Sequence, residues 1–256
     1  MKKEYILVID SGVGGLSTLS KIYKTLPANF IYFADNKNSP YGIHTEEQIF
    51  KFLESIVESV SKKYKLIMVV LACNTATTSS IIRLRDKFKT IKFIGTEPAI
   101  KLAYNNNFKK ILSIATPATI KQKKYKDLTK SLNANIKNIA LKTLASSIEA
   151  SFCKNDFYAN FDMLKNIYNI AYLSRKYDCL VLGCTHYVLI KDKIEQISQK
   201  IAFDGNIGVL NQVLLWYAKL SNKKQTFASI KFLNSMDNKS SNKIYKKIFY
   251  EILAKV

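Results

Sequence analysis

The sequence predicts an α/β protein made of two similar parallel-sheet units, and three observations carry this prediction. Short runs rich in β-branched and aromatic residues alternate with amphipathic stretches along the chain, which is typical of parallel sheets with helical crossovers. The strand-like runs are almost continuously apolar, as in sheets that are buried on both faces. A strand that ends in a small residue and then a cysteine occurs twice, about one domain length apart.

The expected strands lie at residues 5–9, 30–33, 65–72, 92–95, 110–115, 136–141 and 179–183. The clearest helix covers residues 45–64, because Thr45 and Gln48 form a capping box and two glutamates follow in the first turn. Its apolar stripe comprises Ile49, Phe50, Leu53, Ile56, Val57 and Val60.

The two cysteine segments set the expected domain organisation. Val70-Leu71-Ala72-Cys73-Asn74-Thr75 has the same outline as Val181-Leu182-Gly183-Cys184-Thr185-His186. We expect a first domain over residues 1–97 plus 205–256, and a second domain over residues 98–204. Open α/β sheets bind ligands at the carboxyl ends of their strands, so the active site is expected in the cleft between the domains.

Composition and cysteine usage exclude several classes of protein. The 256 residues are 48% hydrophobic and 12% aromatic, which excludes a disordered or low-complexity chain. No apolar run approaches the length of a membrane span, and the run at residues 5–9 is too short for a signal peptide. We therefore expect a cytoplasmic protein whose four cysteines are reduced. Without a Cys-x-x-Cys pair, no metal site is expected.

The net charge of +21 comes from 40 Lys and Arg against 19 Asp and Glu. Such an excess can indicate nucleic acid or an anionic surface as a partner. However, the lysines are scattered and only three arginines are present, although arginine is the residue that reads bases specifically. The prediction is a solvated basic surface, with no nucleic-acid binding or only non-specific binding.

Cys73 and Cys184 each stand where a strand gives way to a helix, so the helix dipole would favour their thiolates. Two such thiols suit a reaction that needs a base and an acid on opposite faces of one carbon, as in inversion at an α-carbon. The alternative is that both are ordinary buried residues, since free cysteine is among the most buried residue types.

Further candidates flank these cysteines. Asp10 ends the first strand, where its carboxylate could bind a ligand ammonium, tune a cysteine or simply cap the next helix. The glycine-rich turn that follows lacks the spacing of a dinucleotide loop, but its backbone N–H groups and the Ser11 hydroxyl suit a small carboxylate. His186 is close enough in sequence to act as a proton partner of Cys184.

Several motifs together resemble those of glutamate racemases. They are Asp10-Ser11-Gly12-Val13-Gly14-Gly15-Leu16, Tyr32-Phe33-Ala34-Asp35, Pro40-Tyr41-Gly42, Ala72-Cys73-Asn74-Thr75-Ala76-Thr77, Ala115-Thr116-Pro117-Ala118-Thr119-Ile120 and Gly183-Cys184-Thr185-His186-Tyr187. The matches follow the family order from residue 5 to about residue 190. The glycine loop alone is a weak signal, whereas the two cysteine motifs together are very specific.

The resemblance implies an enzyme that interconverts L- and D-glutamate without a cofactor, supplies D-glutamate for peptidoglycan and commonly forms a homodimer. Carried over, Cys73 would take the proton from D-glutamate with help from Asp10, and Cys184 the proton from L-glutamate with help from His186. The implied substrate-binding residues are Asp10, Ser11, Tyr41, Gly42, Asn74, Thr75, Thr119, Thr185 and His186.

One departure from the family concerns an active-site glutamate. The family usually reaches this acid through a proline-containing stretch, whereas this chain reads Leu144-Ala145-Ser146-Ser147-Ile148-Glu149. Glu149 can be matched to that catalytic acid, and the alternative is a solvated carboxylate on a helix.

Other functions remain open from the residues alone. An aspartate racemase would differ by one methylene of substrate, which a pocket discriminates only modestly. A cysteine hydrolase or glutaminase would need one nucleophilic cysteine with its own histidine, and would leave the second cysteine motif without a role. A nucleic-acid binder would rest on the +21 charge alone.

Overall fold

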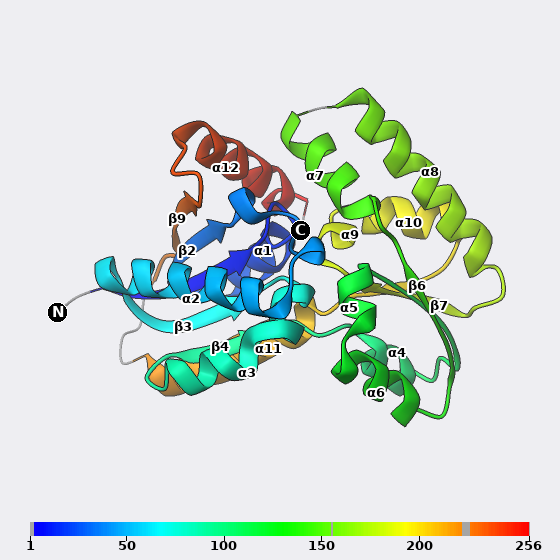
Figure 1. Ribbon diagram of the computed structural model, residues 1–256, viewed down its shortest axis with the longest axis horizontal. Helices are drawn as coiled ribbons and strands as arrows, with labels where there is room; N and C mark the ends of the chain where they lie inside the picture. Colours follow the sequence, from blue (N-terminus) through cyan, green and yellow to red (C-terminus); the bar gives the residue numbers. More distant parts are fainter. Residues whose placement is uncertain (1–2, 155, 222–225, 256) are drawn as a thin grey trace. The chain divides into compact units, whose positions relative to one another are not determined.

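The computed structural model describes residues 3–154, 156–221 and 226–255, and the chain divides into two compact units (Figure 1). Unit 1 comprises Met1–Thr96 and Asn206–Val256, and unit 2 comprises Glu97–Gly205. Each unit is an α/β fold with its own parallel sheet, so the predicted fold class is confirmed. In the described part of the chain, no helix combines the length and apolar character that crossing a bilayer requires.

Unit 1 holds a parallel sheet of strand order β4-β3-β1-β2-β9. Its strands are β1 (Glu4–Asp10), β2 (Asn29–Ala34), β3 (Lys65–Leu71), β4 (Lys92–Gly95) and β9 (Ser229–Asn234). Its helices are α1 (Leu16–Thr25), α2 (Glu46–Lys63), α3 (Asn74–Lys87), α11 (Asn206–Leu220) and α12 (Lys239–Leu253), with short 3-10 turns η1 (Asn36–Asn38) and η2 (Tyr41–Ile43). Because the sheet is buried on both sides, its central strands are apolar at almost every position.

Helices cover both faces of this sheet. Helices α2 and α3 pack together over the face that carries Leu7, Ile9 and Phe33. Helices α11 and α12 pack against α1, where Tyr23 meets Phe249 edge to face. The capping box at Thr45 and the predicted apolar stripe of α2 are both confirmed, since all six stripe residues are buried.

Unit 2 holds a parallel sheet of strand order β6-β5-β7-β8. Its strands are β5 (Lys110–Ala115), β6 (Asn135–Ala140), β7 (Cys179–Gly183) and β8 (Ala202–Phe203). Its helices are α4 (Ile100–Asn105), α5 (Pro117–Lys121), α6 (Lys123–Ser131), α7 (Leu144–Lys154), α8 (Phe157–Ser174), α9 (Thr185–Val188) and α10 (Lys191–Ser198). Helices α7, α8 and α10 share one core with Leu112 and Leu180, while α4 and α6 pack over Ile111 and Val181 on the other face.

Two strands are additions to the predicted set. Strand β8 has only two residues, and β9 alternates exposed and half-buried positions at the sheet edge. Neither therefore shows the continuous apolar run that predicted central strands such as β1, β2 and β7.

Candidate active site

In unit 1, Asp10 and Cys73 lie at the carboxyl ends of neighbouring strands. Strands β1 and β3 pair in register up to Ile9 and Leu71, and the Ala72 N–H donates to the Ile9 carbonyl at 2.9 Å. Asp10 and Cys73 are both buried. The sheet register thus brings to one edge two residues that are far apart in the sequence, as ligand sites of open α/β sheets require.

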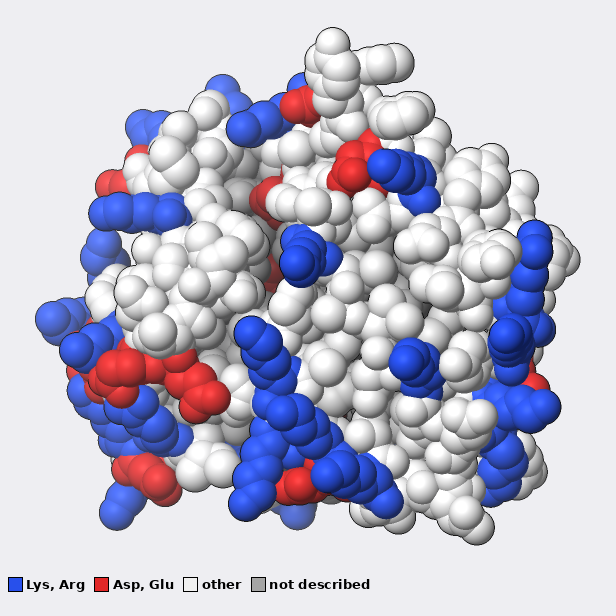
Figure 2. Space-filling view, turned by 45° about the vertical axis from the view of Figure 1, so that its right-hand side comes forward, with Lys and Arg blue, Asp and Glu red and all other residues white. Residues whose placement is uncertain are grey.

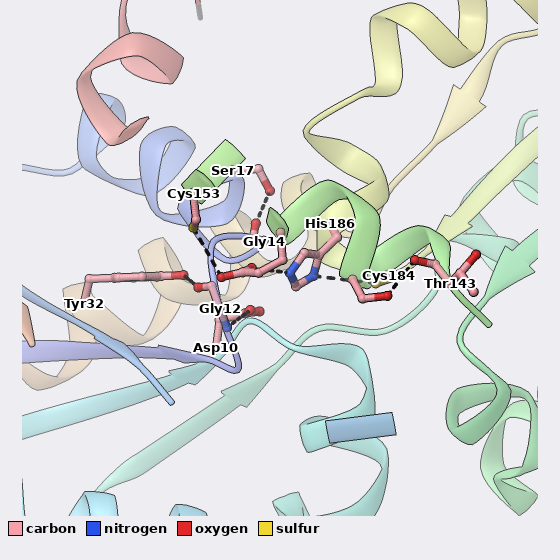
Figure 3. Close-up of polar contacts among 11 residues, drawn as sticks. Asp10, Gly12, Gly14, Ser17, Tyr32, Thr143, Cys153, Cys184 and His186 are labelled. Carbon is pink, nitrogen blue, oxygen red and sulfur yellow. Dashed lines mark hydrogen bonds and ion pairs between the residues drawn. The ribbon is translucent and has the colours of Figure 1, made fainter. Parts of the chain in front are cut away.

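The Asp10 carboxylate organises the glycine-rich turn (Figure 3). Its Oδ1 atom accepts a hydrogen bond from the Gly12 N–H at 3.0 Å, and the Tyr32 hydroxyl donates to the Gly12 carbonyl at 2.5 Å. The N-cap of α1 is Gly15, and no side chain caps it. The reading of Asp10 as the cap of this helix is therefore wrong.

Gly15 is the residue that lets α1 approach the end of the sheet. A Cβ atom at this position would lie 2.6 Å from Asp10 Cβ and 3.0 Å from Ala72 Cβ. Real Cβ atoms do not come so close to one another, so a side chain here would displace Asp10 or the strand that precedes Cys73. The φ angle of Gly15 is −66°, so its backbone conformation does not require a glycine. The glycine is needed because of the close approach.

Cys73 occupies the N-cap of α3, a helix of 14 residues whose first turn contains no acidic residue. The thiol therefore lies near a helix end that carries about half a positive charge, which favours the thiolate. Asn74 and Thr75 form the first turn and are both buried. Their polar groups lie at the same edge of the sheet as Asp10.

Tyr41 and Asp35 form a buried pair at the carboxyl end of β2. The Tyr41 hydroxyl donates to Asp35 Oδ2 at 2.7 Å, and the Asn38 amide donates to both oxygens of the same carboxylate. Burial, and next the Asp35 charge, raise the pKa of Tyr41 well above that of a free phenol, with Cys73 and Asp10 adding to the shift. Because a phenol has one hydrogen to donate, Tyr41 can meet a ligand through its hydroxyl only as an acceptor.

In unit 2, Cys184, His186 and Glu149 form a continuous chain of contacts (Figure 3). Cys184 follows β7 and is the N-cap of α9, and its Sγ lies 3.9 Å from His186 Nδ1. The other ring nitrogen, Nε2, lies 2.7 Å from Glu149 Oε2 on α7. In this order the imidazole can exchange a proton with the thiol, while the carboxylate orients the imidazole and stabilises its charged form.

The electrostatics of this chain favour a protonated imidazole. Burial by itself lowers the pKa of His186, but the contacts with Cys184 and Glu149 outweigh it and leave the pKa well above the ordinary histidine value. The imidazolium next to Cys184 is then a source of positive charge for a thiolate. Helix α9 has only four residues, so the helix dipole predicted for both cysteines applies fully to Cys73 alone.

Cys153 is a neighbour of the site that sequence reasoning left aside. Its Sγ donates to Glu149 Oε1 at 3.5 Å, on the same helix. Burial, and next the Glu149 carboxylate, raise the pKa of this thiol, so it stays protonated and serves as a donor. Its spacing of one helical turn from Glu149 is the signal that could have shown this contact.

The remaining candidates also lie at strand ends. Thr119 is buried in α5, and its N–H donates to the Thr116 hydroxyl that caps this helix. Helix α5 follows β5, which pairs with β7 so that Ala115 stands beside Gly183. Thr185, buried in the first turn of α9, and Thr119 therefore share the sheet edge of Cys184.

The site residues that the sequence singled out thus form two groups, one in each unit. The first group contains Asp10, Ser11, Tyr41, Gly42, Cys73, Asn74 and Thr75, and the second contains Thr119, Glu149, Cys184, Thr185 and His186. Asp35 is an addition, since it is buried and holds Tyr41. Its position directly after a buried strand, like that of Asp10, is the signal that could have found it.

Comparison with solved structures defines the class of protein. The chain is similar to a glutamate racemase of Escherichia coli bound to L-glutamate and an activator, with a TM-score of 0.82, 28% identity, and coverage of 98% of this chain and 95% of that one. A glutamate racemase from Bacillus anthracis gives a TM-score of 0.80 at 25% identity, with the same coverage of both chains. An aspartate racemase from Picrophilus torridus, at 18% identity and a TM-score of 0.56 over 84% of this chain and 94% of that one, shares the fold. The class is that of the aspartate/glutamate racemase superfamily.

Sequence comparison narrows this class to one family. A glutamate racemase of Clostridium botulinum is 35% identical over 255 residues, which are 96% of this chain and 97% of the relative. One from Clostridium novyi is 36% identical over 93% of this chain and 94% of the relative. No protein-family model matches the chain. The chain belongs to the glutamate racemases, a family of isomerases.

Proposed function

We propose that this chain interconverts L- and D-glutamate by moving the α-proton with two thiols, Cys73 and Cys184, and without a cofactor. One thiolate removes the proton from the α-carbon, and the other thiol delivers its own proton to the opposite face of the resulting carbanion. One C–H bond breaks and one forms, so no oxidant or reductant is consumed. The observation that carries the proposal is that each unit presents a buried cysteine at a strand-to-helix junction.

The two thiols have different partners, and the resemblance to glutamate racemases assigns each thiol to one direction of the reaction. Cys73 is supported by the N-terminus of α3, with the Asp10 carboxylate at the same sheet edge as a proton partner. Cys184 is supported by His186, which is held by Glu149. We assign Cys73 to the proton of D-glutamate and Cys184 to the proton of L-glutamate.

Removing the α-proton places negative charge on the α-carboxylate, and the enzyme must stabilise it without an electron sink. Ser11, Asn74, Thr75, Thr119 and Thr185 would supply hydroxyl, amide and backbone donors for the carboxylates. The Tyr41 hydroxyl can only accept a hydrogen bond from a ligand, so it would contact the substrate ammonium. Gly42 has no side chain and would contribute its backbone groups only. These residues are buried or half-buried at the strand ends, where hydrogen bonds to charge are strong.

The cellular role and the assembly that we propose are those that the resemblance to glutamate racemases implies. The product D-glutamate would supply peptidoglycan synthesis in the cytoplasm, and the enzyme would act as a homodimer. Any contact with nucleic acid through the +21 charge would be non-specific and would weaken steeply with salt.

Solvent exchange tests the two-thiol proposal. In deuterated water, the product enantiomer should acquire deuterium at the α-carbon, because the delivering thiol has exchanged with solvent. Recovered substrate should acquire it more slowly, because the abstracting thiol tends to return its own proton. Cys73→Ala and Cys184→Ala should each abolish racemisation, a loss larger than the 10²–10⁴-fold of ordinary acid–base catalysis, because no second group serves that face. A single-cysteine variant that racemises at the wild-type rate, or a requirement for added pyridoxal phosphate or metal, would overturn the proposal.

One observation favours a second candidate function. Cys184, His186 and Glu149 have the order of nucleophile, base and orienting acid found in cysteine hydrolases. An amidase that releases ammonia from glutamine would use this set without Cys73. Ammonia release by Cys73→Ala at the wild-type rate would support the hydrolase, whereas racemisation that is lost in both cysteine variants supports the isomerase.

A further inference from the structure

Helix α8 carries an apolar stripe on its outer face. The residues Phe157, Phe161, Leu164, Tyr168 and Tyr172, hereafter the α8 stripe, recur at spacings of three and four along the helix and are all exposed. Such spacing places them on one side of the helix. The opposite side packs into the core of unit 2 through Met163, Ile167 and Ile170, next to α7 and α10. Helix α8 is therefore apolar on two sides. The inner side is buried in the core of unit 2, and the outer side, which carries the α8 stripe, is exposed.

The same helix is poor in charge. Its 18 residues include one lysine, Lys165, and no arginine, in a chain with 40 Lys and Arg among 256 residues. In Figure 2 the upper right of the molecule is largely white, with few blue Lys or Arg side chains. Depletion of lysine together with enrichment in aromatic residues is the composition of the buried centre of protein interfaces. The cations next to the stripe are Lys165 and Arg175, whose guanidinium lies 5.0 Å from the Tyr172 ring, and a partner recognised by its negative charge would need a denser cluster.

We propose that the α8 stripe is the surface through which two copies of this chain associate, with the two α8 helices packed antiparallel about a two-fold axis. This inference names the surface for the homodimer in the proposed function. A two-fold interface requires a patch that is complementary to itself. The stripe meets this condition, because its aromatic positions are spaced symmetrically about the midpoint between Leu164 and Lys165. Antiparallel pairing brings Phe157 opposite the Tyr172 position of the second copy, and Phe161 opposite its Tyr168 position.

The size of the stripe fits a stable contact. An aromatic side chain has a surface of about 200 Å². Because 63–77% of each of the four aromatic residues is exposed, the stripe with Leu164 presents roughly 600 Å² per copy. A standard interface buries about 800 Å² per partner, and neighbouring residues such as Tyr158 supply the remainder. The helix is about 27 Å long at 1.5 Å per residue, so the seam extends over several turns.

Charge also selects this face. Two copies that each carry +21 repel one another, and the repulsion is least where the surface lacks lysine. Added salt screens the repulsion. Self-association through the α8 stripe should therefore strengthen as salt rises, whereas binding to an anionic partner would weaken.

The test measures the mass of the full-length chain by sedimentation equilibrium over a range of concentrations and salt. The wild type should be dimeric at micromolar concentration. Phe161→Asp and Tyr168→Lys should each weaken association about 100-fold or more, as loss of a central interface aromatic does. Phe227→Asp, a change at an even more exposed aromatic residue outside α8, is the matched control and should leave the dimer intact. Circular dichroism and thermal unfolding check that each variant is folded.

Mixing the two α8 variants tests the antiparallel register. Phe161 of one copy faces Tyr168 of the other, so Phe161→Asp and Tyr168→Lys should restore a mixed dimer through an Asp–Lys pair. A wild type that stays monomeric at every concentration, a Phe161→Asp variant that still dimerises, or a mixture that stays monomeric would each overturn the proposal. Racemisation of L-glutamate is measured on the same wild-type sample. A dimer without activity would then contradict the proposed racemisation alone, and an active monomer would contradict the homodimer and its surface while leaving the racemisation intact.

Discussion

His186 Nε2 and Glu149 Oε2 lie 2.7 Å apart, although 37 residues separate them in the sequence. Glu149 is on α7, which follows β6, while His186 follows β7, and β5 lies between these strands. Helix α7 shares a hydrophobic core with β5 and β7 through Leu144 and Ile148, and it packs against α9, the helix that carries His186. The pair sets the charge state of His186 and hence the electrostatics around Cys184.

We expect Glu149→Gln to lower the pKa of His186. The amide keeps a hydrogen-bonding group in place but removes the negative charge, so burial, which lowers this pKa, is opposed less strongly. The chain has two histidines, so proton NMR of the imidazole resonances can follow the titration, with His44→Gln assigning the other signal. An unchanged titration of His186 in Glu149→Gln would contradict this role of the carboxylate.

The same pair makes stability depend on pH. The pKa of His186 is higher in the folded chain than its unfolded value of about 6.5, so its contribution to stability is complete below that pH. The contribution is lost as the pH rises through the raised folded-state pKa. Denaturant unfolding of the wild type should therefore show a free energy of unfolding that falls in this window. In Glu149→Gln the fall should be smaller, and an equal fall in both proteins would argue against His186 as its source.

Asp10→Asn and His186→Asn should slow the reaction in different directions. Asparagine keeps an oxygen that can accept from the Gly12 N–H, so the first change removes charge beside Cys73 without opening the turn. We expect kcat to fall about 10²-fold or more from D-glutamate for Asp10→Asn, and from L-glutamate for His186→Asn. The ratio of kcat/KM in the two directions stays fixed by the equilibrium constant, so KM must change with kcat. Circular dichroism of each enantiomer measures both directions, and equal loss of kcat in both directions for both variants would contradict the assignment.

Gly15→Ala should destabilise the first unit and reduce activity. The added methyl group would meet Asp10 Cβ at 2.6 Å and Ala72 Cβ at 3.0 Å, and an overpacked site costs about 1–3 kcal/mol. Gly208→Ala is the control, because a Cβ there meets nothing within 4 Å on α11 and alanine is the better helix former by about 0.5–1 kcal/mol. Thermal unfolding and racemisation should separate the two. A Gly15→Ala variant as stable and active as the wild type would show that α1 can move away from Asp10.

The fold could be predicted further than the site. Helix α2 follows from its capping box and apolar stripe, because both signals are local. Strands β1, β2, β3, β5 and β7 follow from their burial on both faces. The contact between Glu149 and His186 depends on how α7 packs against α9, which no local pattern encodes. The resemblance matched Glu149 to the acid of the family, but only the packing shows which atoms it meets. The length of α9 could not be predicted from the local sequence either. The motif around Cys184 predicts where a helix begins but does not indicate where it ends.

Tyr41→Phe should cost more stability than the loss of an ordinary tyrosine hydroxyl. Its acceptor is the buried Asp35 carboxylate, and hydrogen bonds to charged groups contribute about 1.5–3 kcal/mol. Tyr125→Phe is the matched control. The hydroxyl of this buried tyrosine contacts the neutral Ser113 and Asn138 side chains, so its removal should cost about 0.5–1.5 kcal/mol.

Kinetics extend this comparison to the site. Asp35 keeps the Asn38 amide as a donor in Tyr41→Phe but loses its shortest contact, which loosens the end of β2 beside the proposed ammonium site. We expect KM for glutamate to rise several-fold in Tyr41→Phe and to stay at the wild-type value in Tyr125→Phe, which lies outside the proposed site residues. Denaturant unfolding and initial rates on the same preparations check both effects. Equal stability losses in the two variants, with KM unchanged in both, would show that the Tyr41 hydroxyl serves neither Asp35 nor the substrate.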